Sequence, residues 1–280
     1  MAPNPQHWQP TTFIRVVKSL RTATDTVLIM TDQGEGYIKA LGNHGSPQYM
    51  ACELVATELA RWFGLRTLIY AIMEVSEDNE ITLKRGGNAQ PGPAFITQHE
   101  DNDPWGGSAE ELIQVENMQD ITRLVIFDTW TLNCDRYPPN PESRKPNLDN
   151  VFLSKKGAPR GKVILKSMDH THCFTCGEPL NSTTGRIARV QDDRPYGIFP
   201  GFVPYWSALD AREALAKLRT IERDAVTAII ERIPSEWEVD QESRQSLIDL
   251  ICRRAIYMSD NSEAIINTIE SRFESALNTD

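Results

Sequence analysis

Two aspartates and an asparagine flank a short hairpin that the sequence predicts in the middle of the chain. Asp135 follows the apolar end of a predicted helix, and Asn150 stands directly before the first strand of the hairpin, residues 151–153. The second strand, residues 163–168, leads into Asp169. The start of one hairpin strand lies beside the end of the other, so the three polar side chains should gather at one end of a two-stranded ribbon.

This combination of side chains suits phosphoryl transfer. Mg²⁺ prefers oxygen ligands, usually one or two carboxylates together with an asparagine, waters and phosphates. A further carboxylate must orient or deprotonate the acceptor hydroxyl. The simpler interpretation is that Asp and Asn only form turns here, as they often do. Their placement around a single hairpin favours a metal-phosphate site.

A second pair of charged residues lies nearer the N-terminus. Lys39 is in an otherwise apolar stretch at the end of a predicted strand, and Glu53 lies in the helix that follows. Kinases pair a strand lysine with a helix glutamate to orient the lysine nitrogen against the phosphates of a nucleotide. The alternative is that both side chains simply face solvent.

Other combinations of residues give weaker indications of a functional site. His170, His172, Cys173 and Cys176 are crowded together, but structural zinc sites usually take two separated ligand pairs, and the chain has no second Cys-x-x-Cys. We therefore expect these cysteines to be buried or local rather than zinc ligands. The chain also lacks the Gly-x-Ser-x-Gly elbow of a hydrolase and a complete dinucleotide-binding fingerprint.

The elements that position these residues fall into two parts. Before residue 100, apolar patterns predict strands at 13–17, 26–30, 36–40, 68–75 and 95–97, and a helix at 48–63 that Gly64 ends. Beyond residue 100 the chain is predicted to be mainly helical. Apart from the hairpin, we expect helices at about 117–133, 208–232, 240–256 and 262–277.

Composition and charge narrow the class of protein. The chain has 280 residues and a formal net charge of −10, whereas general nucleic-acid and anionic-membrane binders carry an excess of Lys and Arg. Its apolar stretches are too short to cross a bilayer, and its first residues do not form a signal-peptide pattern. The five scattered cysteines favour reduced thiols. We expect a soluble, cytoplasmic protein.

Together the motifs resemble those of HipA-like kinases, and more narrowly the short subgroup that lacks the long N-terminal extension. The resemblance spans roughly residues 25 to 175. The motifs that carry it are Tyr37-Ile38-Lys39, the helix at 52–61 followed by Gly64-Leu65, Asn133-Cys134-Asp135-Arg136, Asn140-Pro141, Asn150-Val151-Phe152-Leu153 and Met168-Asp169-His170. Each is weak alone, and together they are fairly specific.

The resemblance implies a two-lobed α+β fold, similar to that of the protein-kinase and phosphatidylinositol-kinase superfamily. Residues 1–100 would form a small β-rich N-terminal lobe with one helix. Residues 101–280 would form a larger, mainly α-helical C-terminal lobe that carries the catalytic loop and the metal site. ATP and Mg²⁺ would bind between the lobes. The acceptor would be a hydroxyl group, first of all a Ser or Thr of a protein, because HipA-like enzymes are serine/threonine kinases of toxin–antitoxin type. An antitoxin-like partner would fit the same interpretation.

The resemblance also implies roles for single residues. Asp135 would be the catalytic aspartate and Asp169 the magnesium-binding one. Lys39 would hold the nucleotide phosphates, with Glu53 as its partner. The hinge near adenine would be residues 95–100, where Gln98 and His99 would bind the nucleotide mainly through backbone groups.

The chain departs from the family pattern in the asparagine and in the phosphate loop. Asn140 has the usual spacing after Asp135, while Asn150 has the usual position before the hairpin strand, and residues 141–149 look like an insertion. We favour Asn150, because a ligand anchored to a strand is held more rigidly. No glycine-rich loop precedes the lysine strand; Gly34, Gly36 and residues 42–46 are the candidates.

Two other departures keep different functions open. His170-Thr171 follows Asp169 where kinases have Phe-Gly, so we do not expect regulation by a moving phenylalanine. The missing glycine loop and the insertion also suit a non-catalytic kinase-like module that binds a nucleotide or a partner. A third possibility is a kinase that acts on a small molecule or a lipid headgroup.

Overall fold

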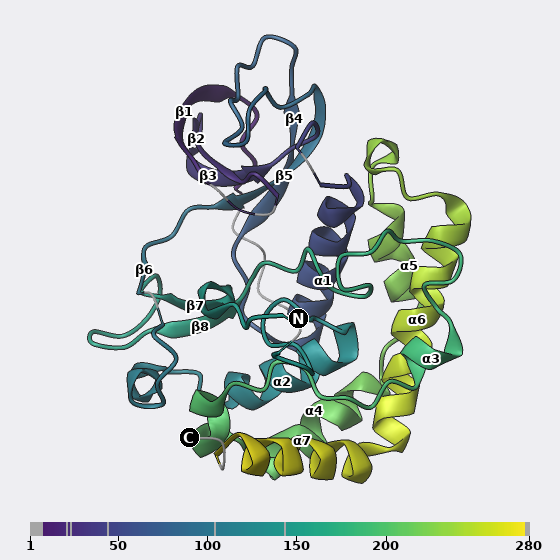
Figure 1. Cartoon of the computed structure of the whole chain (residues 1–280). Helices are drawn as coiled ribbons and strands as arrows, with labels where there is room; N and C mark the ends of the chain where they lie inside the picture. Colours follow the sequence, from purple (N-terminus) through teal and green to yellow (C-terminus); the bar gives the residue numbers. More distant parts are fainter. Residues whose placement is uncertain are drawn as a thin grey trace.

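The computed structural model describes residues 8–20, 22, 24–43, 45–103, 105–142 and 144–277. The chain folds into two lobes, with strands β1 to β5 gathered in one and most helices in the other (Figure 1). A second, small sheet lies where the lobes meet (Figure 1). The predicted two-lobed α+β organisation is confirmed.

The N-terminal lobe is built on a five-stranded antiparallel sheet with the order β1-β2-β3-β5-β4. Its strands are β1 (Phe13–Ser19), β2 (Val27–Thr31), β3 (Gly34–Lys39), β4 (Tyr70–Val75) and β5 (Gly92–Gln98). Lys39 is the last residue of β3 and pairs with Phe95 of β5. The lysine therefore stands at one end of the sheet. Gly36 lies in β3 where a Cβ would come within 2.8 Å of Ile96, so the close packing of the sheet accounts for this glycine.

Helix α1 (Gln48–Phe63) connects the sheet to the helical lobe. It ends where predicted, at Gly64, whose left-handed φ of 95° suits glycine. Its apolar side chains, including Leu54 and Phe63, belong to the core of the helical lobe. The sheet has a smaller core of its own that includes Ile29 and Ile38. Glu53 is therefore carried on a helix that is buried from several sides.

The second sheet forms the floor of the region between the lobes. It contains β6 (Asn102–Asp103), β7 (Val151–Ser154) and β8 (Ile164–Ser167) in the order β6-β7-β8. Val151 pairs with Ser167, so Asn150 and the residues that follow β8 lie at the same end of the hairpin. This is the arrangement that the sequence predicts. Helix α2 (Gln119–Thr131) and two short 3-10 helices, η1 (Glu110–Gln114) and η2 (Leu148–Asn150), support the hairpin.

The remaining helices complete the C-terminal lobe. They are α3 (Ile187–Val190), η3 (Pro200–Tyr205), α4 (Ala208–Leu218), α5 (Arg223–Glu231), η4 (Ser235–Trp237), α6 (Gln241–Asp260) and α7 (Ser262–Leu277). The prediction of a single helix at 208–232 is wrong, because this segment forms two helices, α4 and α5, with a turn between them. Thr220 donates its side-chain hydroxyl to the Lys217 carbonyl there and closes α4. Among the described residues, no helix has both the length and the apolar character needed to cross a bilayer.

Candidate active site

A cavity of about 480 Å³ lies between the two sheets and is lined from both lobes. Its size falls in the range of small-molecule sites, roughly 300–1,000 Å³. The polar side chains of the lining include Thr22, Thr24, Thr26, Lys39, Glu53, Glu100, Asp135, Asn147, Asn150, Asp169 and His172. The apolar ones include Leu20, Leu68, Phe95, Val151, Phe152 and Met168. The lining thus contains most of the residues that the sequence singles out.

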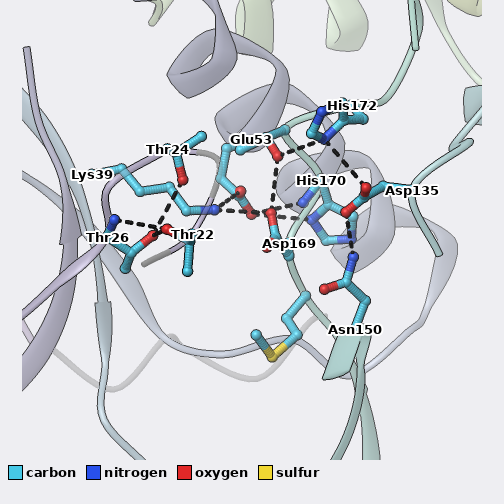
Figure 2. Close-up of polar contacts among 12 residues, drawn as sticks. Thr22, Thr24, Thr26, Lys39, Glu53, Asp135, Asn150, Asp169, His170 and His172 are labelled. Atoms are coloured by element: carbon cyan, nitrogen blue, oxygen red, sulfur yellow. Dashed lines mark hydrogen bonds and ion pairs between the residues drawn. The ribbon is translucent and has the colours of Figure 1, made fainter. Parts of the chain in front are cut away.

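Lys39 bridges two carboxylates that come from different elements, one on α1 and one after β8 (Figure 2). Its Nζ donates to Glu53 Oε2 at 2.6 Å and to Asp169 Oδ1 at 3.0 Å. Burial alone would lower the pKa of Lys39, but the charges of Asp169 and Glu53 outweigh it and raise the pKa above its ordinary value. Burial would likewise raise the pKa of Glu53, and the Lys39 charge reverses the shift to well below the ordinary value. Lys39 and Glu53 are therefore both charged at neutral pH.

His170 fixes the segment after Asp169 against helix α1. Its backbone N–H donates to Glu53 Oε1 at 3.1 Å. Its fully buried ring lies 3.2 Å from the hydroxyl of Thr57 and 2.8 Å from that of Ser167. A phenylalanine at this position could make neither ring contact, so the His170-Thr171 departure gives the segment a polar anchor.

Asp169 lies two residues beyond the end of β8 in a left-handed conformation, with a φ of 54°. This region is uncommon for residues other than glycine, and such strain costs on the order of 1–3 kcal/mol and often accompanies function. Thr171 Oγ1 donates to Asp169 Oδ1 at 3.0 Å, and the carboxylate stays 28 % exposed in the cavity. The strained backbone thus presents a partly open carboxylate beside Lys39.

Asp135 lies on a loop that begins where α2 ends. Leu132 closes the helix with a φ of 55°, and Asn133 Oδ1 accepts from the Asp135 backbone N–H at 3.2 Å. The carboxylate has partners on both oxygens: Arg144 on Oδ1, and the Asn150 amide at 2.8 Å on Oδ2 (Figure 2). The loop therefore holds Asp135 in one orientation within the cavity.

The charge of Asp135 is set by its neighbours. Burial would raise its pKa, but His172, Arg144 and the hydrogen bond from Asn150 outweigh burial and hold the pKa below its usual value. His172 Nδ1 lies 3.8 Å from Asp135 Oδ1, yet burial lowers the pKa of His172 itself. The imidazole is thus neutral near pH 7, and Arg144 supplies the positive charge. Asp135 is a carboxylate that can accept a hydrogen bond from a hydroxyl.

Arg136, which the motif contains but which had no predicted role, joins the parts of the site. Its fully buried guanidinium forms an ion pair with Asp128 of α2. It also donates to the Asn150 carbonyl at 3.0 Å and to the Met168 carbonyl at 2.8 Å. One side chain therefore fixes the positions of Asn150 and of the residue before Asp169. In the sequence, the only feature that indicated a role for Arg136 was its position directly after Asp135.

The two candidate asparagines lie in different surroundings. Asn150 is buried in the cavity lining against Asp135, whereas Asn140 is exposed and accepts the Glu142 backbone N–H at 3.2 Å. Asn147, which the sequence did not indicate, also lines the cavity and donates to Asn150 Oδ1 at 3.2 Å. Arg144 and Asn147 both come from the expected insertion, so this segment forms part of the site.

The predicted hinge residues lie beside the cavity. The backbone N–H of Gln98 donates to the Ile69 carbonyl at 2.8 Å, and that of His99 donates to the Glu35 carbonyl at 2.9 Å. These donors are therefore engaged by the N-terminal lobe, and the described cavity lining includes neither residue. A nucleotide-binding role for Gln98 and His99 stays a prediction.

Their neighbours Thr97 and Glu100 do line the cavity. Glu100 is buried, forms an ion pair with Lys166 of β8 and accepts the Ser154 hydroxyl at 2.7 Å. The hinge is thus tied to the second sheet by a buried carboxylate. This contact joins distant parts of the sequence, and no local motif marked Glu100 within the hinge.

A threonine-containing loop borders the cavity in the N-terminal lobe. Thr22, Thr24 and Thr26, between β1 and β2, line the cavity, and their hydroxyls are hydrogen-bonded to one another at 3.1 and 3.2 Å (Figure 2). The glycines proposed from the sequence lie elsewhere. Gly34 is at the β2–β3 turn, and Gly42 packs against Gln90. His44, within the candidate segment 42–46, is outside the described residues.

The oxygen donors fit Mg²⁺ better than a metal that needs a full set of protein ligands. Among the described residues, no group of three or more His, Cys, Asp or Glu side chains is placed to hold a metal. Mg²⁺ usually keeps several waters and binds through one or two carboxylates and the phosphates of its substrate. Asp169, partly exposed beside Asn150 in the same cavity, meets that requirement.

Comparison with known proteins identifies the architecture. No family model and no curated protein matches the chain. Among solved structures, it is similar to the crystal structure of the Helicobacter pylori proinflammatory kinase CtkA. The chain has a kinase-like fold. The match has a TM-score of 0.55 and covers 95 % of this chain and 98 % of that chain, at 12 % sequence identity. At this identity the likeness concerns the fold, and it agrees with the two lobes and the cavity between them.

Proposed function

We propose that this chain is an ATP- and Mg²⁺-dependent kinase that transfers the γ-phosphoryl group to a hydroxyl acceptor, with a Ser or Thr of a protein as the first candidate. The observation that carries the proposal is the bridge from Lys39 to Glu53 and Asp169 in a cavity that also holds Asp135. The similarity to a kinase supports it. Membership of the HipA-like group rests on the sequence motifs.

Each residue would contribute by position and charge. Lys39, held by Glu53, would orient the nucleotide phosphates. Asp169 and Asn150 would hold Mg²⁺, which when bound neutralises charge on the phosphates. Asp135, a carboxylate at neutral pH, would accept a hydrogen bond from the acceptor hydroxyl and direct its oxygen. Catalysis would then depend on alignment and electrostatics.

A kinase-like module that binds nucleotide without transferring phosphate is the second candidate. The ion pair between Arg144 and Asp135 favours it, because the guanidinium occupies one oxygen of the proposed catalytic carboxylate. A kinase for small molecules or lipid headgroups would use the same site with a different acceptor.

The decisive experiment is transfer of label from [γ-³²P]ATP with Mg²⁺, with and without cell lysate, by the wild type and by Asp135→Asn. The substitution keeps the size of the side chain and removes its charge. We expect Asp135→Asn to reduce transfer by roughly 10²–10⁴-fold. A labelled protein band or autophosphorylation supports a protein kinase, and label only in small molecules supports the other acceptor class. Equal transfer by the two proteins would show that Asp135 has no catalytic role.

A further inference from the structure

Two cysteines from separate segments meet beside Asp135. Cys134, buried, directly precedes Asp135, while Cys176, exposed, lies in the segment that follows Asp169. The two segments run together along the end of α2: the Phe174 N–H donates to the Thr131 carbonyl at 2.6 Å. The Cys176 thiol donates to the Leu132 carbonyl at 3.6 Å. Backbone structure therefore brings these thiols together without a disulfide between them.

The two thiols differ in reactivity. A hydrogen bond from Cys134 is the main reason that the pKa of Cys176 lies below its ordinary value, against the effect of burial, and the Arg144 charge contributes in the same direction. The same hydrogen bond raises the pKa of Cys134. An exposed thiol with a lowered pKa beside a second thiol is the arrangement found in peroxide-sensitive dithiols.

We propose that Cys176 and Cys134 form an oxidative modification site, at which hydrogen peroxide converts the two thiols into a disulfide. The Cys176 thiolate attacks one peroxide oxygen, which gives a sulfenic acid and releases hydroxide. The Cys134 sulfur then attacks the Cys176 sulfur, the S–S bond forms, and the sulfenic oxygen leaves as water with the proton of the Cys134 thiol. Overall two thiols lose two electrons and peroxide is reduced to two waters.

The other cysteines are placed differently. Cys52, Cys173 and Cys252 are buried, and burial raises the pKa of each thiol. The Cys173 thiol is turned toward Thr131 Oγ1, at 3.6 Å. Cys173 and Cys176 form a Cys-x-x-Cys in sequence, but the exposed Cys176 has its thiol partner in Cys134. Of the two cysteines that lie close together in the sequence, Cys173 is thus structural and Cys176 is reactive.

The disulfide would affect the catalytic carboxylate through Arg144. The Arg144 guanidinium donates to Cys134 Sγ at 3.4 Å and also to Asp135, so it contacts both the thiol and the carboxylate. Bond formation would draw Cys134 toward Cys176 and displace the loop that orients Asp135. Displacement of a catalytic group by about 1 Å can reduce a rate by roughly 10²-fold. This consequence rests on the proposed kinase function, whereas the disulfide itself does not.

Peptide mapping tests the modification directly. The reduced full-length chain is treated with hydrogen peroxide, its remaining thiols are alkylated, and it is digested with trypsin without reductant. Cleavage after Arg123, Arg136, Lys166 and Arg186 yields peptides 124–136 and 167–186. We expect these peptides to be linked, with fragmentation that places the link at Cys176 and with separation by dithiothreitol. An internal Cys173–Cys176 disulfide, or Cys176 oxidised only to sulfinic acid, would overturn the proposal.

Substitutions supply the controls. Cys176→Ser should abolish the linked peptide, and Cys252→Ser, which changes a buried cysteine of α6, should leave it unchanged.

Fully linked wild type should transfer phosphate roughly 10²-fold more slowly than the reduced protein, and dithiothreitol should restore the rate. Cys176→Ser should keep its rate after the same treatment. Equal rates for linked and reduced protein would overturn control of catalysis. Absence of transfer in both states, with the link formed, would instead contradict the proposed kinase function.

Discussion

At the scale of single residues, the site depends on charges that satisfy one another across the two lobes. Lys39 would be costly to bury alone, and so would Glu53, which is 3 % exposed. Removing one partner of a buried ion pair costs about 3–5 kcal/mol, because the other charge is left uncompensated. Asp169 is more open, so its share of this cost is smaller. The same contacts that stabilise the fold therefore prepare the site.

We predict that Glu53→Gln lowers the free energy of unfolding at neutral pH, and that its difference from wild type shrinks in acid. The folded pKa of Glu53 is depressed below the ordinary 4.5. Its contribution is thus fully present above that value and is lost as the pH falls toward the folded pKa. Urea unfolding of both proteins at pH 7 and at several values below 4.5 measures the difference.

The surface pair of Glu263 with Arg212 provides the control for this titration. Glu263→Gln should leave the free energy of unfolding nearly unchanged, because exposed ion pairs contribute little. A difference between Glu53→Gln and wild type that stayed constant through the acid range would contradict the assigned ionisation of Glu53.

A second prediction concerns Arg144, which positions Asp135 from the inserted segment. Arg144→Ala should slow phosphate transfer by roughly 10²-fold or less, because Asp135 loses one of the contacts that orient it. The shift in melting temperature caused by Mg-ATP should be unchanged, since Arg144 is not among the residues that line the cavity. Arg144→Lys should give an intermediate rate. Faster transfer by Arg144→Ala would instead identify the ion pair as an inhibitory contact.

At the scale of elements, Arg136 fastens helix α2 to both loops of the site. We predict that Arg136→Met destabilises the protein by about 3–5 kcal/mol, because Asp128 is left buried without its cation. The double variant Arg136→Met/Asp128→Leu should recover much of this loss, since replacing both charges by apolar groups removes the uncompensated charge. Urea unfolding measures all three proteins. Equal stability of the single and double variants would show that Asp128 needs no cation.

Local patterns predicted most of these elements. The apolar period over 48–63 and the C-cap Gly64 gave α1 with its observed bounds, because a buried helix with a glycine stop is a strong local signal. The hairpin was also predictable, and its register brings Asn150 to the end of β8. The break between α4 and α5 was not, because it involves no glycine or proline and depends on the Thr220 contact.

Contacts between distant segments were the part that local patterns could not supply. Lys39 and Glu53 were paired from the order of a strand and a helix, but the bridge from Lys39 to Asp169 spans 130 residues. Arg144 reaches Asp135 from a loop without periodicity, and the threonine loop has no glycine signature. Such contacts depend on how the two lobes pack against each other. No short segment of the sequence carries that information.

At the scale of the whole molecule, the two lobes are held together by α1, by the hinge and by the Lys39 bridge. Helix α1 belongs to the core of the helical lobe, while Glu53 on the same helix reaches the strand lysine of the sheet lobe. Glu100 ties the hinge to the second sheet. A ligand in the cavity would contact residues of both lobes, so its binding should stabilise their arrangement as a unit.

The corresponding prediction is that Mg-ATP raises the melting temperature of the wild type. A ligand that binds only the folded state stabilises it by about 2.7 kcal/mol at a hundred times its Kd, which corresponds to roughly 5–10 °C for a chain of this size. Asp169→Ala should remove most of the shift, because the variant loses the carboxylate that would hold Mg²⁺. Asp101→Ala, which removes a carboxylate that is 93 % exposed, should retain it. Scanning fluorimetry with Mg²⁺ alone, ATP alone and both together separates the contributions. If saturating Mg-ATP left the wild type unshifted, the cavity would not be a nucleotide site. An equal shift in Asp169→Ala would place the metal elsewhere.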